Sequence, residues 1–376
     1  MNDNEGCINL VEEAMNALDV NIDSKSYFNN YSVKPRKSLE VPVLLVYLER
    51  RSKDRVFYLY YPRYRTWSRF SVTLPPDSIL LPTDNIREVI PCGHGKLHFI
   101  QSKYPSAFHG SRLCYYDSSS DNWLSLNCSR SFHKVFVRND EIYALVSENQ
   151  PDCCVNAVAR GDCRNNHRLV ITKYNPESNS WEDISSFDLG LRHGICIVAK
   201  DNFVYFLGGR PWKALTNAER YDLTTNSWNK IADLQEKRSY AKGAAGRRKI
   251  FILGGEWTES CEVYNEKTNE WQLIASLSCL NYRQELLALP VCVDDRLFVL
   301  TKEVANGCSG KIMSYDPRKN DWKEETQIPD TKAGVSISFC TSGYLRVTGG
   351  YICRRPRGPS TLGGSGGMLP RKILKF

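Results

Sequence analysis

The sequence predicts an all-β protein in which six repeats each form a small antiparallel sheet, and three features carry this prediction. A Tyr precedes a Trp by seven residues six times over. Turn-forming residues stand between the two aromatics in most copies. The Trp positions recur every 43 to 58 residues, 51 on average, which leaves room for about four short strands per repeat. The pairs are Tyr60/Trp67, Tyr116/Trp123, Tyr174/Trp181, Tyr221/Trp228, Tyr264/Trp271 and Tyr315/Trp322.

Each aromatic pair predicts a β-hairpin. In the stretch ERYDLTTNSWNKI (219–231), Tyr221 ends one β-favouring run and Trp228 opens the next. Five copies carry Asn or Asp directly after the Tyr and again two residues before the Trp. Both residue types tolerate left-handed backbone angles and bond the local backbone, so the same turn recurs five times. The first copy departs from the pattern, with Tyr61 and Arg65 at these positions.

The repeat length and the six copies together predict a six-bladed β-propeller. Each blade has an inner strand, a second strand, a strand that ends at the Tyr and an outer strand that opens at the Trp. In the fifth blade these are residues 241–245, 250–253, 260–264 and 271–274. The fourth and fifth blades carry VYFLGG and KIFILGG, apolar strands that end in a glycine doublet and so permit close backbone approach. The region 38–350 therefore resembles a kelch-repeat β-propeller.

Closure of the ring is expected to join the two ends of the repeat region. Residues 335–340 supply the missing inner strand of the first blade, because residues 41–48 already fill its second position. The segment YLRVTGG (344–350) then has no position of its own. Either it opens a truncated seventh blade or the N-terminal strand is displaced, and we favour six closed blades with residues 344–350 left over.

Composition places the chain among soluble, folded proteins. With 376 residues and 41% hydrophobic content, it can bury a large core. No apolar run approaches the ~18 residues of a membrane span, and the start MNDNEG does not resemble a signal peptide. The 14 Cys are scattered, so we expect reduced and mostly buried thiols rather than a disulfide framework. The expected location is the cytoplasm, without membrane contact.

The net charge of +8 is concentrated near the end of the sequence. The residues after position 353 contain six basic and no acidic side chains, which leaves +2 for the rest: Arg354, Arg355, Arg357, Arg371, Lys372 and Lys375. The nearly neutral body lacks the interleaved basic and aromatic residues of nucleic-acid modules, so nucleic acid is not an expected partner. The segment 351–376 is rich in Gly and Pro and is expected to be a disordered tail.

The N-terminal segment 1–37 contains one expected helix. The stretch INLVEEAMNAL (8–18) places apolar residues on one helical face, and Asn9 with Glu12 resembles a capping box. Together with KPRKS (34–38), it resembles the last helix and linker of a BACK domain in the BTB-BACK-kelch, or kelch-like, family. The alternative is a short helix that caps the propeller.

This resemblance implies a function in protein binding. In kelch-like proteins the BTB domain dimerises and binds a cullin, while the propeller captures a substrate for ubiquitination. By resemblance, the chain is the non-catalytic substrate-recognition part of an adaptor for a cullin-RING E3 ubiquitin ligase. A cullin is then a partner only if the full-length protein has a BTB domain. One alternative is an actin-binding kelch protein, and a weaker one is a propeller enzyme of the copper-oxidase or glycan-processing type.

Candidate binding residues gather in loops of consecutive blades. Trp212 and Trp257 follow the two glycine doublets, between the second and third strands. The connections between blades emerge on the same face, and similar loop positions line the substrate pocket in the family. Trp, Tyr and Arg dominate protein interfaces. The candidates are Trp212, Trp257, Tyr240, Arg210, Arg192, His193, Arg238, Tyr282 and Arg283. Alternatively, the Arg side chains brace backbone carbonyls and the Trp rings lie against their own blades.

An enzymatic site has little support in the sequence. His94 and His98 have a metal-like spacing, but they flank a turn into a strand that separates them. The densest group of soft ligands lacks CxxC spacing and consists of Cys153, Cys154, Cys163 and His167. There is no P-loop or GxGxxG motif, and the one GxSxG match, residues 363–367, falls in the tail. We expect no catalytic residue, no metal and no cofactor.

Overall fold

The computed structural model describes most strands of the expected propeller. The described residues are 39–50, 55–70, 85–92, 96–102, 112–117, 122–126, 130, 132–139, 141–148, 168–188, 192, 194–210, 212–256, 258–277, 289–293, 295–302, 310–329, 335–347 and 373–375. All regular elements in these ranges are β-strands. They include no helix long and apolar enough to cross a membrane. The expected helix within residues 1–37 lies outside the described residues.

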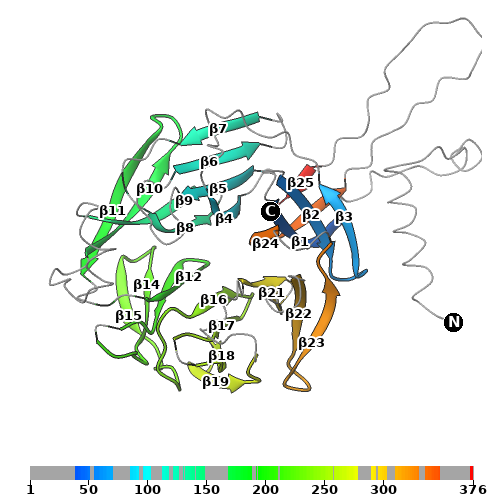
Figure 1. Ribbon diagram of the computed structural model, residues 1–376. Helices are drawn as coiled ribbons and strands as arrows, with labels where there is room; N and C mark the ends of the chain where they lie inside the picture. Colours follow the sequence, from blue (N-terminus) through cyan, green and yellow to red (C-terminus); the bar gives the residue numbers. More distant parts are fainter. Residues whose placement is uncertain are drawn as a thin grey trace, which may run out of the picture.

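Six antiparallel sheets stand around a common axis (Figure 1). The first strand given for each blade lies nearest the axis. Blade 1 contains β24 (Val335–Val347), β1 (Leu39–Arg50), β2 (Arg55–Tyr61) and β3 (Thr66–Phe70). Blade 2 contains β4 (Asn85–Cys92), β5 (Lys96–Ser102), β6 (Arg112–Asp117) and β7 (Asn122–Leu126). Blade 3 contains β8 (Phe132–Arg138), β9 (Glu141–Ser147), β10 (Arg168–Asn175) and β11 (Ser180–Asp188).

The other half of the ring repeats this plan. Blade 4 contains β12 (Cys196–Lys200), β13 (Phe203–Leu207), β14 (Ala218–Asp222) and β15 (Ser227–Lys230). Blade 5 contains β16 (Lys242–Ala245), β17 (Lys249–Leu253), β18 (Cys261–Asn265) and β19 (Glu270–Ile274). Blade 6 contains β20 (Leu289–Val293), β21 (Arg296–Lys302), β22 (Gly310–Asp316) and β23 (Asp321–Gln327). The predicted six-bladed propeller is confirmed, and the predicted strands of blade 5 agree to within one residue.

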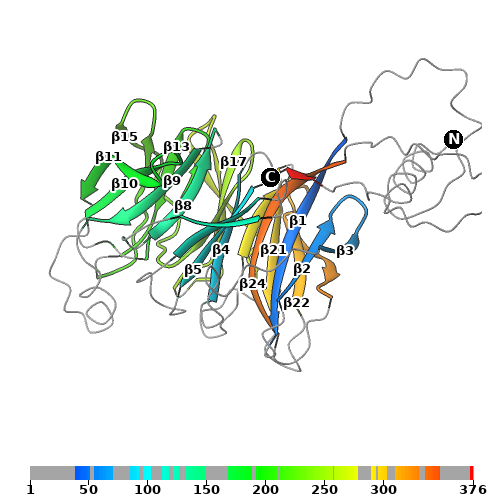
Figure 2. The ribbon, with the colours of Figure 1, turned by 90° about the horizontal axis from the view of Figure 1, so that it is seen from above.

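Closure differs from the prediction in one respect. Strand β24 runs without a break from Val335 to Val347 and pairs along its length with β1, as Figure 2 shows from above. The segment expected to be left over, 344–350, therefore begins inside the inner strand of blade 1: Tyr344 to Val347 pair with Pro42 to Leu39. The physical reason is that β1 offers backbone partners beyond the blade, so ladder pairing continues through Thr341 to Gly343 despite their turn-prone composition.

A short strand also forms within the segment that we expected to be disordered. Ile373–Lys375 form β25, which pairs with Tyr344 to Arg346 of β24. Two residues of this strand are apolar, and the edge of β24 offers unpaired backbone donors and acceptors. The rest of the segment 351–376 lies outside the described residues.

The core lies between neighbouring blades rather than in one central cluster. One cluster joins blades 6 and 1, and others join blades 2 and 3, blades 3 and 4, blades 4 and 5, and blades 5 and 6. Fully burying one such aliphatic or aromatic side chain stabilises a fold by roughly 1.5–3 kcal/mol. Each blade therefore depends on the next, as in other repeat folds.

The aromatic pairs form the hairpins that the sequence predicts. In every blade the Tyr lies directly opposite its Trp in the ladder between the third and fourth strands. The residue two before the Trp has a left-handed backbone at Asn179, Asn226, Asn269 and Asn320, with φ between 47° and 55°. Arg65 adopts the same conformation, with φ of 54°, so the left-handed turn forms in the copy that has neither Asn nor Asp at this position.

Candidate protein-binding site

The candidate residues that the structure describes lie on one face of the ring, where inner strands begin and second strands end; we call it the loop face. Two loops of this face, residues 208–217 and 254–260, follow β13 and β17, and residues 231–241 link β15 to β16. Backbone hydrogen bonds connect these loops to one another. Gly209 N–H donates to Arg238 O at 2.8 Å, and Arg238 N–H donates to Leu215 O at 3.0 Å. The loops of blades 4 and 5 therefore form one connected surface.

The glycine doublets make this close approach possible. A Cβ at Gly208, whose φ is 62°, would lie 2.4 Å from Arg238 O. A Cβ at Gly255, whose φ is 137°, would lie 3.0 Å from Ser239 O. A side chain at Gly208 would overlap the backbone of the linker from blade 4 to blade 5. The expectation that the doublets permit close backbone contact agrees with this geometry.

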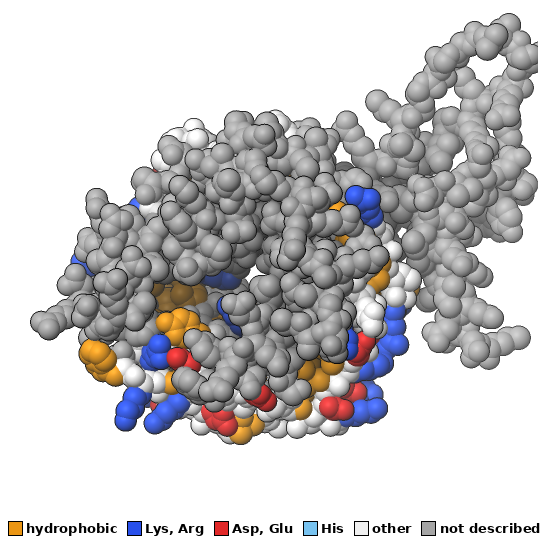
Figure 3. Space-filling model, viewed as in Figure 1, with side chains coloured by type: hydrophobic (Ala, Val, Ile, Leu, Met, Phe, Trp, Pro, Cys, Tyr) orange, Lys and Arg blue, Asp and Glu red, His pale blue; other side chains and the backbone are white. Residues whose placement is uncertain are grey.

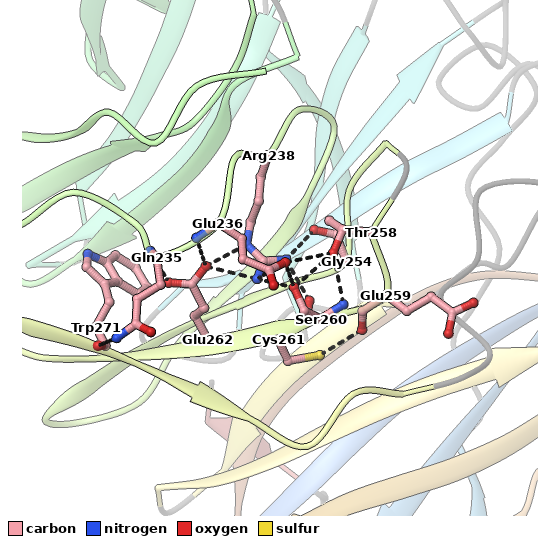
Figure 4. Close-up of polar contacts among 10 residues, drawn as sticks. All are labelled: Gln235, Glu236, Arg238, Gly254, Thr258, Glu259, Ser260, Cys261, Glu262 and Trp271. Carbon is pink, nitrogen blue, oxygen red and sulfur yellow. Dashed lines mark hydrogen bonds and ion pairs between the residues drawn. The ribbon is translucent and has the colours of Figure 1, made fainter. Parts of the chain in front are cut away.

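Arg238, expected to contact a partner, is instead an internal brace (Figure 4). Its side chain is 0% exposed and pairs with Glu262, which is also 0% exposed, at 2.9 Å. The guanidinium donates to Gly254 O at 2.8 Å and to Ser260 O at 2.6 Å. We therefore correct this assignment. The buried guanidinium of Arg238 donates to Glu262, to the carbonyls of Gly254 and Ser260 and to Ser260 Oγ, and these acceptors hold it inside blade 5. A buried guanidinium requires such a set of acceptors.

Arg192 repeats this arrangement one blade earlier. It pairs with Glu219 at 3.0 Å and donates to Gly208 O at 2.8 Å, and its side chain is 13% exposed. In both blades an Arg of the preceding linker joins a Glu two residues before the repeat Tyr to the first carbonyl of the glycine doublet. The recurrence supports the bracing alternative for Arg192 as well.

Tyr240 lies on the loop face in a conformation unusual for a bulky residue. Its φ is 57°, in the left-handed region, and its ring is 46% exposed. Tyr240 N–H donates to Gly194 O at 2.6 Å, and the ring covers Gly194 so closely that a Cβ there would lie 2.9 Å from it. A left-handed backbone in a residue of this size is strained, and such strain clusters at functional sites. Tyr240 is thus a fixed, half-exposed aromatic platform.

Arg210 lies beside this platform and is oriented by Glu256. Its guanidinium lies 5.4 Å from the centroid of the Tyr240 ring and 2.6 Å from a carboxylate oxygen of Glu256. Ser239 Oγ donates to the same carboxylate at 2.9 Å. The side chain of Arg210 remains 31% exposed, while Glu256 is 9% exposed. Arg210 is thus held between the Glu256 carboxylate and the Tyr240 ring, with about a third of its side chain exposed.

Trp212 is the most exposed large hydrophobic side chain among the described residues, at 74%. It follows Arg210 in the same loop, two residues along. Figure 3 views the ring from the side of these loops, and described hydrophobic, basic and acidic side chains lie next to one another at its lower left. Four other candidates, His193, Trp257, Tyr282 and Arg283, lie outside the described residues.

Sequence reasoning missed the acidic partners in this network, Glu219, Glu256 and Glu262. A signal was present for one of them. Arg210 and Glu256 occupy the same repeat position, directly after the glycine doublet, in adjacent blades. Opposite charges one repeat apart predict a pair across a blade boundary, because equivalent loops of neighbouring blades lie side by side. Glu219 and Glu262 share the position two residues before the Tyr, and each pairs with the Arg of the linker before its own blade.

A further acid beside Arg238, Glu236, has a lowered pKa (Figure 4). Ser260 Oγ donates a short hydrogen bond to Glu236, and this bond holds the pKa of the Glu236 carboxyl below its usual range. Within the described part of the chain, no group of three or more His, Cys, Asp and Glu residues could hold a metal ion. The soft-ligand group at Cys153, Cys154, Cys163 and His167 lies outside that part.

Comparison with known proteins gives kelch-like proteins and alpha-scruin among the relatives of this chain. No family model matches the chain. Kelch-like protein 35 of Mus musculus is 27% identical over 198 residues, which cover 51% of this chain and 32% of that protein. Alpha-scruin of Limulus polyphemus is 26% identical over 245 residues, which cover 59% of this chain and 25% of that protein. The chain thus spans only a quarter to a third of the length of these relatives.

A solved structure supports the fold independently. The structure of YjhT superposes with a TM-score of 0.52 at 11% identity, and the match covers 78% of this chain and 98% of that one. At this identity the match supports the architecture alone.

Proposed function

We propose that this chain, a kelch-repeat propeller related to the kelch-like proteins, works by binding a partner protein on its loop face. One observation carries the proposal: Trp212 and Tyr240, 74% and 46% exposed, stand in connected loops beside the partly exposed Arg210. Aromatic and Arg side chains of this kind contribute most of the affinity of protein interfaces. Exposing them on loops held by buried ion pairs provides a rigid surface, which lowers the ordering cost of binding.

The same propeller is proposed to be the substrate-recognition part of a kelch-like adaptor for a cullin-RING E3 ubiquitin ligase in the cytoplasm. The similarity to a kelch-like protein and the exposed loop aromatics support this role. A cullin would join only through a BTB domain, if the full-length protein carries one. We propose no catalytic residue, because Arg192, Arg210 and Arg238, the candidate Arg side chains that the structure describes, are each paired with a Glu.

Affinity purification with the chain as bait tests the binding role. Wild type is compared with Trp212→Ala and with Tyr240→Gly, where Gly suits the left-handed backbone. The matched control is Leu273→Ala, since Leu273 is 41% exposed but lies on outer strand β19. A direct partner, identified by quantitative mass spectrometry, should lose about 30-fold or more in affinity in both loop variants, as expected for hot-spot residues of ~2 kcal/mol or more.

The control decides what a loss means. A partner retained by Leu273→Ala and lost from both loop variants places recognition at the loop face. Equal retention by all variants contradicts the proposal. Co-sedimentation with actin filaments, unchanged in the loop variants, would favour the actin-binding alternative instead.

A further inference from the structure

The turns between third and outer strands carry the same Asn in four blades, but the residue that follows it differs. Asn179 and Asn226 are followed by Ser, whereas Asn269 is followed by Glu and Asn320 by Asp. All four Asn are exposed to solvent. The stability of each amide against loss of ammonia therefore depends on the residue after it and on how firmly the amide is held.

The sequence Asn226-Ser227 permits a reaction within the chain itself. The backbone nitrogen of Ser227 attacks Cγ of Asn226, its proton leaves with the side-chain nitrogen as ammonia, and a five-membered succinimide forms. Water then opens the ring at either of its two carbonyls, which gives an aspartyl or an isoaspartyl residue at position 226. The small Ser obstructs ring closure less than Glu or Asp does. Asn is for such reasons among the thermally labile residues of proteins.

The amide of Asn226 is held less firmly than its counterpart in blade 5. Its Oδ1 accepts one hydrogen bond from the described residues, from Tyr221 Oη at 3.2 Å. In blade 5, Asn269 Oδ1 accepts two, from Tyr264 Oη at 2.9 Å and from Ala232 N–H of the preceding blade at 2.9 Å. Two bonds from different blades oppose the rotation that brings Cγ to the next backbone nitrogen.

The hairpin that contains Asn226 has a weak outer strand. Strand β15 has four residues, and all of them are exposed. Ser227 pairs with Asp222 at the end of this short ladder. The exposed end of a short ladder opens at low cost, and opening frees the Ser227 nitrogen to reach the side chain.

We propose that Asn226 is a site of spontaneous deamidation, with water as the only co-reactant, and that it reacts ahead of the corresponding Asn of blades 5 and 6. An aspartyl product fits the turn, because Asp tolerates the left-handed backbone of position 226, where φ is 53°, and blade 2 has Asp121 there. An isoaspartyl product does not fit, because its main chain runs through Cβ and adds an atom between Tyr221 and Trp228. Isoaspartate that accumulates with time therefore opens the outer hairpin of blade 4. This inference does not depend on the proposed binding role.

Incubation of the purified chain at physiological temperature and mildly alkaline pH tests the proposal. Peptide mapping by mass spectrometry follows each turn Asn, and electron-transfer dissociation distinguishes isoaspartyl from aspartyl products. Asn226 should react about tenfold faster than Asn269 or more, because the following residue and the additional hydrogen bond act together. The control Ser227→Glu gives blade 4 the residue that follows Asn in blade 5, and it should slow the reaction of Asn226 several-fold.

The variant Glu270→Ser separates the two causes. With Ser after both amides, Asn226 should still react about fivefold faster than Asn269, the factor expected of one hydrogen bond of ordinary strength. Equal rates in this variant would assign the whole difference to the following residue.

Hydrogen exchange of the aged protein tests the structural consequence. The amides of β15 should lose protection in molecules that contain isoaspartate and keep it in the Asn226→Asp variant. A reaction of Asn226 no faster than that of Asn269 in the wild type, or one that Ser227→Glu does not slow, would overturn the proposal. Full protection of β15 in the isoaspartyl form would overturn the opening of the hairpin.

Discussion

The boundary between blades 5 and 6 and the boundary between blades 6 and 1 use the same repeat position in different ways. In blade 6, Asn320 accepts a hydrogen bond from Tyr315 Oη at 2.9 Å and another from Ala275 N–H of blade 5 at 2.8 Å. The indole of Trp322 donates to Ala275 O at 2.8 Å. One Tyr-Asn-Trp set therefore holds both backbone groups of Ala275.

The boundary between blades 4 and 5 is built in the same manner. Asn269 accepts from Tyr264 Oη at 2.9 Å and from Ala232 N–H at 2.9 Å. The indole of Trp271 donates to Ala232 O at 2.9 Å. The aromatic pair seven residues apart thus serves two purposes. It packs within its own hairpin, and together with the Asn between the two rings it hydrogen-bonds the backbone of the preceding blade. We call this Tyr-Asn-Trp contact the latch.

Blade 1 lacks the Asn, and its boundary with blade 6 is different. Arg65 occupies the position and pairs with Glu325 at 3.2 Å, while the indole of Trp67 donates to Thr326 Oγ at 3.2 Å. Tyr60 Oη is buried and has no hydrogen-bond partner among the described residues. Burial, followed by the charge of Glu325, raises the pKa of Tyr60 to about 12. Without the amide, one phenol is left unsatisfied and an ion pair replaces the latch.

The largest expected effect comes from removing the amide where it forms a latch. Asn269→Gly keeps the left-handed turn, which Gly adopts easily, but deprives Tyr264 Oη and Ala232 N–H of their acceptor. Two unsatisfied donors should lower the free energy of unfolding by about 2–4 kcal/mol. Urea denaturation followed by Trp fluorescence measures the change.

The matched substitution at the same repeat position is Arg65→Gly. It removes an ion pair whose Arg is 55% exposed; Glu325 is only 2% exposed, but it keeps its contacts with Arg296 and Ser314, so the loss should be about 1 kcal/mol. The midpoint of urea denaturation should therefore move much less than in Asn269→Gly. Equal losses in the two variants would mean that the turn, and not the latch, determines stability at this position.

The fold could be predicted from the sequence because its determinants are local and repeated. Each hairpin places its Tyr opposite its Trp whatever the rest of the chain does, so the register was evident from spacing. The continuation of β24 past Cys340 could not be predicted in this way. It depends on β1, almost 300 residues earlier in sequence, which supplies the pairing partners for Thr341 to Val347.

The candidate site was predictable in position but not in the role of each residue. The glycine doublets located the loops that carry Arg210 and Trp212. Whether an Arg contacts a partner or the interior depends on its acceptors: Arg238 is buried because Glu262 and two carbonyls converge on it from another part of blade 5. Tyr240 combines a left-handed backbone with a hydrogen bond to Gly194 in another linker, and sequence spacing reveals neither.

A smaller effect is expected when only the indole donor is removed. Trp322→Phe retains most of the ring but loses the bond from Nε1 to Ala275 O, at an expected cost of about 1 kcal/mol. The control is Trp228→Phe: Trp228 is 38% exposed, and no described residue accepts a bond from its Nε1. The same urea titration should show a smaller change there. A larger loss in Trp228→Phe would contradict the role given to the indole latch.

The sharpest test is a small gain of stability in blade 1. Arg65→Asn restores the repeat residue, so Tyr60 Oη acquires an acceptor within its own hairpin, and Asn suits the φ of 54° better than Arg does. The ion pair with Glu325 is lost, but Arg296 still donates to Glu325 at 3.0 Å. The net change in the free energy of unfolding should be a gain of about 0.5–1 kcal/mol.

The double variant Tyr60→Phe/Arg65→Asn separates the two sources of this gain. Tyr60→Phe alone should cost little, because it removes a buried hydroxyl that makes no bond. If the restored hydrogen bond produces the gain, Arg65→Asn should stabilise the wild type but not the Tyr60→Phe protein. If it stabilises both equally, the gain comes from the backbone angle alone, and the amide in the other blades acts mainly as a turn residue. A double-mutant cycle on urea midpoints thus decides whether the Tyr-Asn bond or the left-handed turn makes this position distinctive.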